Sequence, residues 1–262
     1  MLLYRVKRRA EKTAKWLAGF WHWHITLRLL RLTGKPINNL NCFERRIHSQ
    51  NWEDGMIHAI FGVIGVTNKY YVEFGVENGT ECNTRTLMLR GGWTGLLMDG
   101  GFDDPAMNLH REFITAENIE ILFTKYDVPN AFDLLSIDID GNDYWVWKAI
   151  GRYHPRVVIM EYNACIPYLP AVTVPYRTDF RWDKTDYYGA SLGALVALGK
   201  QKGYTLVATD GRGVNAFFVE STLAEKHFVP HAPELLYRPA MFKGKLGGHP
   251  HDTSGRPWIP VS

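Results

Sequence analysis

The chain predicts an α/β protein with a doubly wound, mostly parallel, seven-stranded sheet and an antiparallel hairpin near its C-terminal end. Short apolar runs rich in aromatic and β-branched residues alternate with segments whose apolar residues recur at helical spacing. This alternation is typical of parallel strands joined by helices that cover both faces of the sheet. The run FDLLSIDID at 132–140 is almost continuously apolar, which indicates a strand buried on both faces.

The expected elements follow one another from residue 43 onward. Residues 43–65 predict a helix, with Ser49 as its N-cap and glycines at its end. Strands are expected at 69–76, 93–100, 110–118, 132–140 and 155–163, and a hairpin that turns at DGRG is expected at 204–220. Helices are expected between them at 82–92, 118–128, 144–151 and 190–203. The hairpin should add one antiparallel strand at an edge of the sheet.

Charge divides the chain into two unequal parts. Residues 1–35 hold nine lysines and arginines and one acid, a formal charge of +8, so the other 227 of the 262 residues sum to −5 within a total of +3. We expect a basic, tryptophan-rich, helical extension (1–40) and a main domain (41–230) with a polar, aromatic insertion (164–188). A C-terminal loop or tail (231–262) should follow.

The N-terminal extension fits neither a signal peptide nor a membrane-spanning helix. It lacks a clean apolar core with a small-residue cleavage site, and Arg28 and Arg31 interrupt its apolar stretch. One interpretation is a helix that docks on an anionic membrane surface or on a partner. The other is a helix that packs on its own domain or on a second subunit of a homo-oligomer.

Composition also limits the partners and the compartment. A specific nucleic-acid partner is disfavoured, because the body of the chain is acidic. The three cysteines are far apart and form no CxxC pair, which favours reduced thiols. We therefore expect a cytoplasmic protein, peripheral on the inner face of a membrane if the extension docks there.

The stretch VEFGVENG (72–79) places an acid and two glycines at the end of the first expected strand. In open α/β sheets, ligands bind beyond the carboxyl ends of the strands, and glycine lets a ligand approach the backbone closely. The spacing differs from the GxGxxG pattern, so a nicotinamide-dependent oxidoreductase is disfavoured. Carboxylates at Glu73 and Glu77 would repel a phosphate, so the stretch predicts a ligand with a cationic amine and no phosphate.

Together with SQNWEDG, GWTGLLMDG, LLSIDIDGNDYWVW, VVIMEYN and GVNAFFV, this stretch resembles class I S-adenosylmethionine-dependent methyltransferases. The similarity is to FkbM-like and related small-molecule O-methyltransferases, over most of residues 49–219. It implies a Rossmann-like methyltransferase fold for 41–230 and S-adenosylmethionine as the cofactor. The residues that it implies for the cofactor are Glu73, Gly75 and Gly79 (methionine part), Asp99 (ribose hydroxyls), and Ala116 and Glu117 (adenine). Asp103, in the acidic stretch after Asp99, competes for the ribose role, because any carboxylate can accept two hydroxyl hydrogen bonds.

A second stretch, SIDIDGNDYWVW, resembles the DADKxNY element of divalent-cation-dependent catechol and caffeoyl-CoA O-methyltransferases. That resemblance implies that Asp138 binds the metal. The next strand ends at Glu161 and Asn163, whose oxygens suit Mg²⁺. These three residues form the candidate metal site. The alternative is that Asp138 contacts the amino group of the cofactor or orders its loop.

Methyl transfer to a hydroxyl requires an in-line approach and removal of the hydroxyl proton. The candidate catalytic residues are Asp138 and two histidines of the C-terminal segment, His249 and His251. The insertion is rich in tyrosine, tryptophan and arginine, and is expected to form the wall for a small-molecule or glycan acceptor. The alternative is a surface cover or an oligomer contact. Because no single base stands out, a non-catalytic scaffold or binding protein with the same fold stays open as an alternative.

Overall fold

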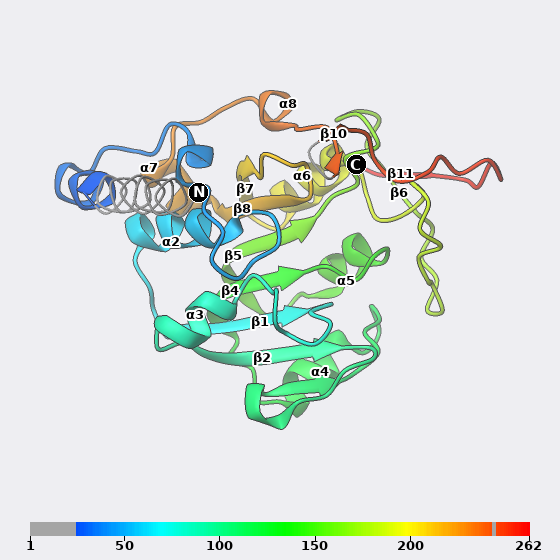
Figure 1. The fold of residues 1–262 in the computed structure, drawn as a ribbon, viewed down its shortest axis with the longest axis horizontal. Helices are drawn as coiled ribbons and strands as arrows, with labels where there is room; N and C mark the ends of the chain where they lie inside the picture. Colours follow the sequence, from blue (N-terminus) through cyan, green and yellow to red (C-terminus); the bar gives the residue numbers. More distant parts are fainter. Residues whose placement is uncertain (1–24, 243–244) are drawn as a thin grey trace, which may run out of the picture.

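The computed structural model describes residues 25–242 and 245–262 (Figure 1). At its centre is a seven-stranded sheet with the strand order β3-β2-β1-β4-β5-β8-β7. The strands are β1 (Tyr70–Phe74), β2 (Thr94–Asp99), β3 (Leu109–Arg111), β4 (Ala131–Ile137), β5 (His154–Glu161), β7 (Tyr204–Thr209) and β8 (Asn215–Glu220). The first five pair in parallel, and β8 is antiparallel to both of its neighbours. The expected fold class, a mostly parallel Rossmann-like sheet with an antiparallel hairpin, is confirmed.

The position of the hairpin corrects one expectation. β8 lies between β5 and β7, so the antiparallel strand is next to the edge and β7 forms the edge itself. Every residue of β8 except Glu220 is buried, whereas Thr205 of β7 is exposed and Val207 is half-buried. The more apolar strand therefore takes the inner position, where both faces of the sheet are covered.

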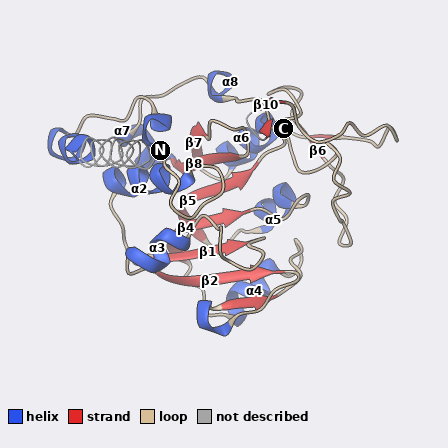
Figure 2. Ribbon diagram, in the orientation of Figure 1, coloured by secondary structure: helices blue, strands red, loops and turns tan. Residues whose placement is uncertain are grey.

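Helices cover both faces of the sheet (Figure 2). One layer holds η1 (Leu40–Phe43), α2 (Glu53–Ile64), α3 (Arg85–Arg90) and α7 (Ser221–His227). The other layer holds α4 (Ile119–Lys125), α5 (Asp143–Ala149) and α6 (Leu192–Gln201). Alternate strand residues separate the two cores, so Val72 and Phe74 pack with α4 and α5 while Tyr71 packs with α2. Glu73, two residues after Tyr71 on the same strand, therefore faces the α2–α3 side.

The expected helix at 43–65 is divided. Residues 40–43 form η1, and α2 begins only after Trp52, whose backbone is left-handed (φ 79°). Ser49 is not the N-cap residue, because α2 begins only after Trp52. Its hydroxyl nevertheless accepts the N–H of Asp54, in the first turn of α2, at 3.1 Å, and it donates to Asp54 Oδ2 at 2.7 Å. The same oxygen accepts the backbone N–H groups of residues 47–49, each at 2.8 Å. These groups have no helical partner, and Asp54 closes the loop that contains them.

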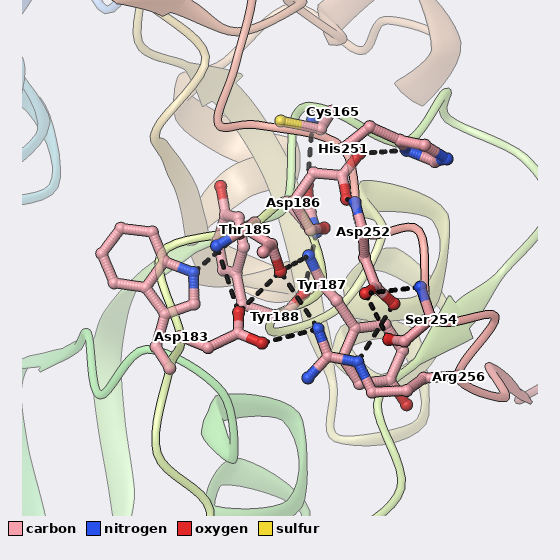
Figure 3. A network of polar contacts seen from close by, with 12 residues as sticks. Cys165, Asp183, Thr185, Asp186, Tyr187, Tyr188, His251, Asp252, Ser254 and Arg256 are labelled. Atoms are coloured by element: carbon pink, nitrogen blue, oxygen red, sulfur yellow. Dashed lines mark hydrogen bonds and ion pairs between the residues drawn. The ribbon is translucent and has the colours of Figure 1, made fainter.

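The insertion and the C-terminal segment pack together. β6 (Val172–Thr173) pairs with β11 (Ile259–Pro260), and β9 (Met241–Phe242) pairs with β10 (Lys245–Leu246). Arg256 donates to Asp252 at 3.0 Å and to Thr185 at 3.1 Å, and pairs with Asp183 at 2.8 Å (Figure 3). Its guanidinium also lies 4.1 Å from the centre of the Tyr187 ring. These contacts fix the C-terminal segment to the insertion. Two further short helices are η2 (Pro105–Met107) and α8 (Pro233–Leu236).

Residues 1–24 of the expected N-terminal extension lie outside the described residues, and residues 25–33 form a helix at one end of the molecule (Figure 1). Leu27 is 5% exposed and belongs to the same core as α2. A Cβ atom at Gly62 of α2 would lie 3.4 Å from a Leu27 methyl carbon. These contacts attach the described part of the extension to the domain. Within the described ranges, no helix is long and apolar enough to cross a membrane.

Candidate functional site

A cavity of about 690 Å³ lies at the carboxyl ends of β1, β2, β4 and β5. The strand order reverses between β1 and β4, which is where ligands bind in sheets of this kind. The ends of these strands and the loops after them form most of the wall. The rest comes from the start of α2, residues 112–114 after β3, residues 214–215, residues 180–182 and His249. The volume is in the range of sites for cofactors and small molecules.

Gly75 lies at the turn after β1, as expected, but the chain itself requires it. Its backbone is left-handed (φ 77°), and its N–H donates to the Met98 carbonyl at 3.0 Å. A Cβ atom at this position would lie 1.4 Å from the carbonyl oxygen of Asp138. The loops after β1 and β4 therefore touch through Gly75. Gly79 is also left-handed (φ 71°), and a Cβ there would lie 3.1 Å from the Met107 methyl carbon.

Glu73 is 4% exposed, and its carboxylate is satisfied within the chain. Oε1 accepts the Asn83 N–H at 2.8 Å and the Ser136 hydroxyl at 3.1 Å. Oε2 accepts the Thr84 N–H at 2.8 Å and the Thr84 hydroxyl at 2.6 Å. Burial raises the pKa of Glu73, although these hydrogen bonds oppose the shift. Glu73 thus ties the start of α3 to β1 and β4 and forms part of the cavity wall.

Asp99 ends β2 and lines the cavity. Its Oδ2 accepts the Glu77 N–H at 2.8 Å and its Oδ1 accepts the Gly101 N–H at 2.7 Å. The carboxylate therefore joins the loop after β1 to the loop after β2 at the wall of the cavity. Asp103, the competing acid, is exposed.

The expected strand at 110–118 is shorter, because β2 ends at Asp99 and offers no partner beyond Arg111. The following turn places Ala116 and Glu117 against the insertion. The Ala116 N–H donates to the Tyr176 hydroxyl oxygen at 3.1 Å, and the Tyr176 hydroxyl donates to Glu117. The cavity wall on this side comes from residues 112–114.

Three carboxylates meet at the ends of β4 and β5. One oxygen each of Asp138, Asp140 and Glu161 lies within 4.8 Å of the others. Ile137 pairs with Met160, so Asp138 and Glu161 are neighbours across the two strands. Asp140 joins them from the turn after β4, where its backbone is left-handed (φ 56°). The structure therefore brings together two of the three predicted metal ligands and adds one that was not singled out for that role.

Asn163, the third predicted ligand, makes three hydrogen bonds to the backbone. Its Nδ2 donates to the carbonyls of Asp186 and Tyr188 at 2.8 Å, and its Oδ1 accepts the Cys165 N–H at 3.0 Å. These bonds hold the insertion against the end of β5.

The three cysteines, Cys42, Cys82 and Cys165, are free thiols in the structure.

Sequence reasoning did not single out Asn215 and Glu53. Asn215 pairs with Glu161 across β5 and β8, and its Nδ2 donates to Glu53 Oε1 at 2.8 Å. The buried atoms Glu161 Oε2 and Asn215 Oδ1 have no hydrogen-bond partner among the described residues. Two buried acceptors without donors indicate a site for a ligand that brings donors or positive charge. Glu53 lies in the stretch SQNWEDG and Asn215 lies in GVNAFFV. Their hydrogen bond, and the pairing of Asn215 with Glu161, become visible only in the folded chain.

The cavity is strongly acidic. Its lining includes nine carboxylic acids, whereas its basic lining residues are Arg181 and His249; the acids are Glu53, Glu73, Glu77, Glu81, Asp99, Glu112, Asp138, Asp140 and Glu161. Burial raises the pKa values of Asp138 and Glu161, and the charges of neighbouring acids raise them further. Burial and the charge of Asp143 raise the pKa of Asp140 to about 6. A cation in the cavity would relieve this repulsion.

The two candidate histidines have different surroundings. His249 lines the cavity, with its ring centre 4.4 Å from that of Trp182 and 5.7 Å from that of Tyr188. Burial lowers its pKa, which favours a neutral ring that can accept a proton. The side chain of His251 is 83% exposed, and its Nδ1 lies 2.8 Å from Asp186 Oδ2 (Figure 3). The Asp186 carboxylate raises the pKa of His251.

The insertion covers one side of the cavity. Phe180 packs so closely on Gly141 that a Cβ atom there would lie 2.3 Å from its ring. The Arg181 guanidinium lies 4.0 Å from the centre of the Phe113 ring, on the opposite wall. The Asn142 side chain donates to the Arg177 carbonyl at 2.7 Å. The segment therefore bridges the loops after β3 and β4 above the cavity.

No family model matches the chain, and the search of curated proteins found no match. Among solved structures, it is similar to TnmH, with 14% identity and a TM-score of 0.36 over 58% of this chain and 49% of TnmH. It is also similar to a SAM-dependent methyltransferase from Aquifex aeolicus, with 9% identity and a TM-score of 0.32 over 63% of this chain and 89% of that one. A third similarity is to the mitomycin 7-O-methyltransferase MmcR, with 15% identity and a TM-score of 0.31 over 65% of this chain and 56% of that one. The match thus spans about half the length of TnmH and MmcR. The fold assignment depends on the strand order, not on these low scores.

The raised pKa values of Asp140 and Asp210 predict that the ligand-free protein is more stable at pH 6 than at pH 8. Burial raises the pKa of Asp140 to about 6 and that of Asp210 to about 7. Between the usual aspartate pKa of 3.8 and these raised values, the folded protein holds protons that the unfolded chain has released, so stability falls as pH rises from about 4 through 6–7. His227 and His249, whose pKa values burial lowers, oppose this effect below about pH 6.5. Melting temperatures measured in EDTA across this range test it, and a rise from pH 6 to pH 8 contradicts it.

Proposed function

We propose that the protein is an S-adenosylmethionine-dependent methyltransferase that acts on a hydroxyl of a small molecule, sugar or glycan. One observation carries the proposal: the cavity at the carboxyl ends of β1, β2 and β4 is lined by nine acids and a glycine turn. The sequence resemblance described above supports the same cofactor.

The charge of the cavity selects among cofactors. A nucleotide phosphate placed among these carboxylates would be repelled, because charges at such distances interact strongly away from bulk water. S-adenosylmethionine carries a sulfonium and an ammonium group and no phosphate. Its cationic part therefore suits the region near Glu77 and Asp140, and its ribose suits Asp99.

Different residues of the cavity would bind different parts of S-adenosylmethionine. Asp99 accepts the ribose hydroxyls. Phe113 and Ile114, which line the cavity, border the adenine. Ala116 and Glu117 follow them in the same turn. Gly75 and Gly79 shape the loop around the methionine part, and Glu73 positions that loop through its bonds to Asn83 and Thr84.

The acceptor would lie between the acidic group and the insertion. Trp182 and His249 supply an aromatic wall there, and Glu161 and Asn215 supply buried acceptor oxygens. Bound S-adenosylmethionine supplies an electrophilic methyl group. His249, neutral because burial lowers its pKa, is placed to take the proton of the acceptor hydroxyl, and the insertion excludes water. Asp138 is the second candidate base, while His251 pairs with Asp186 at the surface.

The acidic group also fits a divalent cation. Asp138, Asp140 and Glu161 offer hard oxygen ligands within 4.8 Å of one another, and Glu161 Oε2 has no other partner among the described residues. We propose Mg²⁺ at these three residues, with Asn163 holding the insertion beside them. Such an ion would lower the pKa of an acceptor hydroxyl.

Calorimetric titration with S-adenosylmethionine tests the cofactor site. We expect the wild-type chain to bind it and Asp99→Asn to bind it at least ~10-fold more weakly, because one charge-assisted hydrogen bond is lost. Asp103→Asn, an exposed acid in the same loop, is the matched control and should bind like wild type. Melting temperatures show whether Asp99→Asn still folds. A wild-type chain without any binding heat would favour the scaffold alternative, and equal affinities for both variants would refute the ribose assignment.

A further inference from the structure

The helix at residues 25–33 has two opposite faces. Leu27 is 5% exposed and Leu30 packs against the same core, so this face contacts the domain. At roughly 100° per residue, Ile25, Leu29 and Leu32 fall on the other face. Their exposed fractions are 54%, 54% and 76%. These three residues form an apolar stripe that the described part of the molecule leaves uncovered.

Basic residues accompany the apolar stripe on the same segment. Arg28 and Arg31 are exposed on the same helix, and Lys35 is exposed just after it. Residues 1–35 carry a formal charge of +8, while the rest of the chain carries −5. The surface that fits this helix therefore combines negative charge with an apolar layer.

We propose that the apolar stripe docks the protein on the anionic surface of a lipid bilayer, with the helix in the plane of the interface. Apolar side chains at the level of the headgroups, beside arginines that meet lipid phosphates, are the arrangement of interfacial helices. A second copy of the chain fits less well. A two-fold contact through the stripe would bring the positive charges of this segment in the two copies, including Arg28 beside the stripe, close together. This inference does not depend on the proposed methyltransferase activity.

Sedimentation of the full chain with vesicles tests the proposal. At low salt we expect binding to phosphatidylcholine vesicles that contain phosphatidylserine, and no binding to pure phosphatidylcholine. Raising the salt to about 0.5 M should release the protein, because it screens the arginines. The double variant Arg28→Gln/Arg31→Gln should bind ~25-fold more weakly, at ~5-fold for each basic residue.

The apolar stripe is tested by Ile25→Gln/Leu29→Gln/Leu32→Gln, which should abolish vesicle binding. Its melting temperature should stay close to that of wild type, because all three side chains are exposed. Leu235→Gln, at an apolar residue of α8 that is 69% exposed, is the matched control and should bind like wild type. The proposal is overturned if wild type ignores anionic vesicles at low salt, or if the triple variant binds them equally well. It is also overturned if wild type is a dimer that the triple variant converts to a monomer, since a second copy would then cover the stripe.

Discussion

Replacing Gly75 with alanine should prevent the chain from reaching its native fold, or lower its melting temperature by ~10–20 °C. The new Cβ atom would lie 1.4 Å from the carbonyl oxygen and 2.5 Å from the carbonyl carbon of Asp138. Both atoms belong to the backbone, so no side-chain rotation relieves the collision. The loops after β1 and β4 would have to separate, and with them the central pair of parallel strands. The left-handed backbone (φ 77°) adds a strain of about 1–2 kcal/mol for any residue with a Cβ.

The matched control is Gly203→Ala. Gly203 has a similar backbone angle (φ 83°), and a Cβ atom there would meet nothing within 4 Å. This variant should show the strain alone, a loss of ~2–8 °C in thermal melting. Equal small losses in the two variants would contradict the backbone contact. Loss of S-adenosylmethionine binding in a Gly75 variant would therefore report the loss of the fold, and Asp99→Asn is the better probe of the proposed cofactor site.

Gly75 shows how far sequence reasoning reached. The motif placed a glycine turn at the mouth of the site, and the structure has it there. In the structure the Asp138 carbonyl excludes a side chain at this position, and the contact of Gly75 with the cofactor stays a prediction. The spacing of the glycines in the motif indicates a position without a side chain. It does not indicate which neighbouring atom would collide with a Cβ there.

The strand pattern predicted the sheet, because alternation and apolar runs report local burial. The place of β8 depends on which strand is covered on both faces, and that is decided by contacts distant in sequence. The same limit applies to the site. Asp138 and Glu161 were predicted from their positions at strand ends, whereas Asn215 joins them only through the register of β5 and β8.

Local hydrogen bonds explain why the start of α2 differs from the prediction and what the Asn163 side chain contacts. Ser49 has the chemistry of an N-cap, but the Asp54 carboxylate collects the backbone N–H groups of residues 47–49 and keeps that segment out of α2. Asn163 has the chemistry of a metal ligand, yet its amide is used by the insertion. The expected helix start at Ser49 was therefore wrong by its position, although the Ser49 hydroxyl still accepts the Asp54 N–H. The metal role of Asn163 stays a prediction.

Changing Glu161 to glutamine should stabilise the ligand-free protein and remove its binding of Mg²⁺. Glu161 lies beside Asp138 and Asp140, and burial together with these charges raises its pKa. At pH 8 the neutral amide removes one member of a repelling group, so the melting temperature should rise by about 2–4 °C, the shift that ~1 kcal/mol produces in a domain of this size. At pH 5 the gain should shrink, because the wild-type group then holds protons.

Titration of EDTA-treated protein with MgCl₂ measures the second effect. Wild type should bind the ion and melt at a higher temperature in its presence, since a ligand of the native state stabilises it by mass action. Glu161→Gln should show neither change. Glu81→Gln is the matched control, because Glu81 lines the same cavity but pairs at its rim with Arg46 at 3.0 Å, with its side chain 55% exposed; this variant should respond to Mg²⁺ like wild type. A Glu161→Gln protein that melts lower than wild type at pH 8 would make Glu161 a structural acceptor, and one that still binds Mg²⁺ would place any metal site elsewhere. A stabilising substitution at a buried acid, joined to the loss of cation binding, is the combination expected of a residue kept for function at the expense of stability.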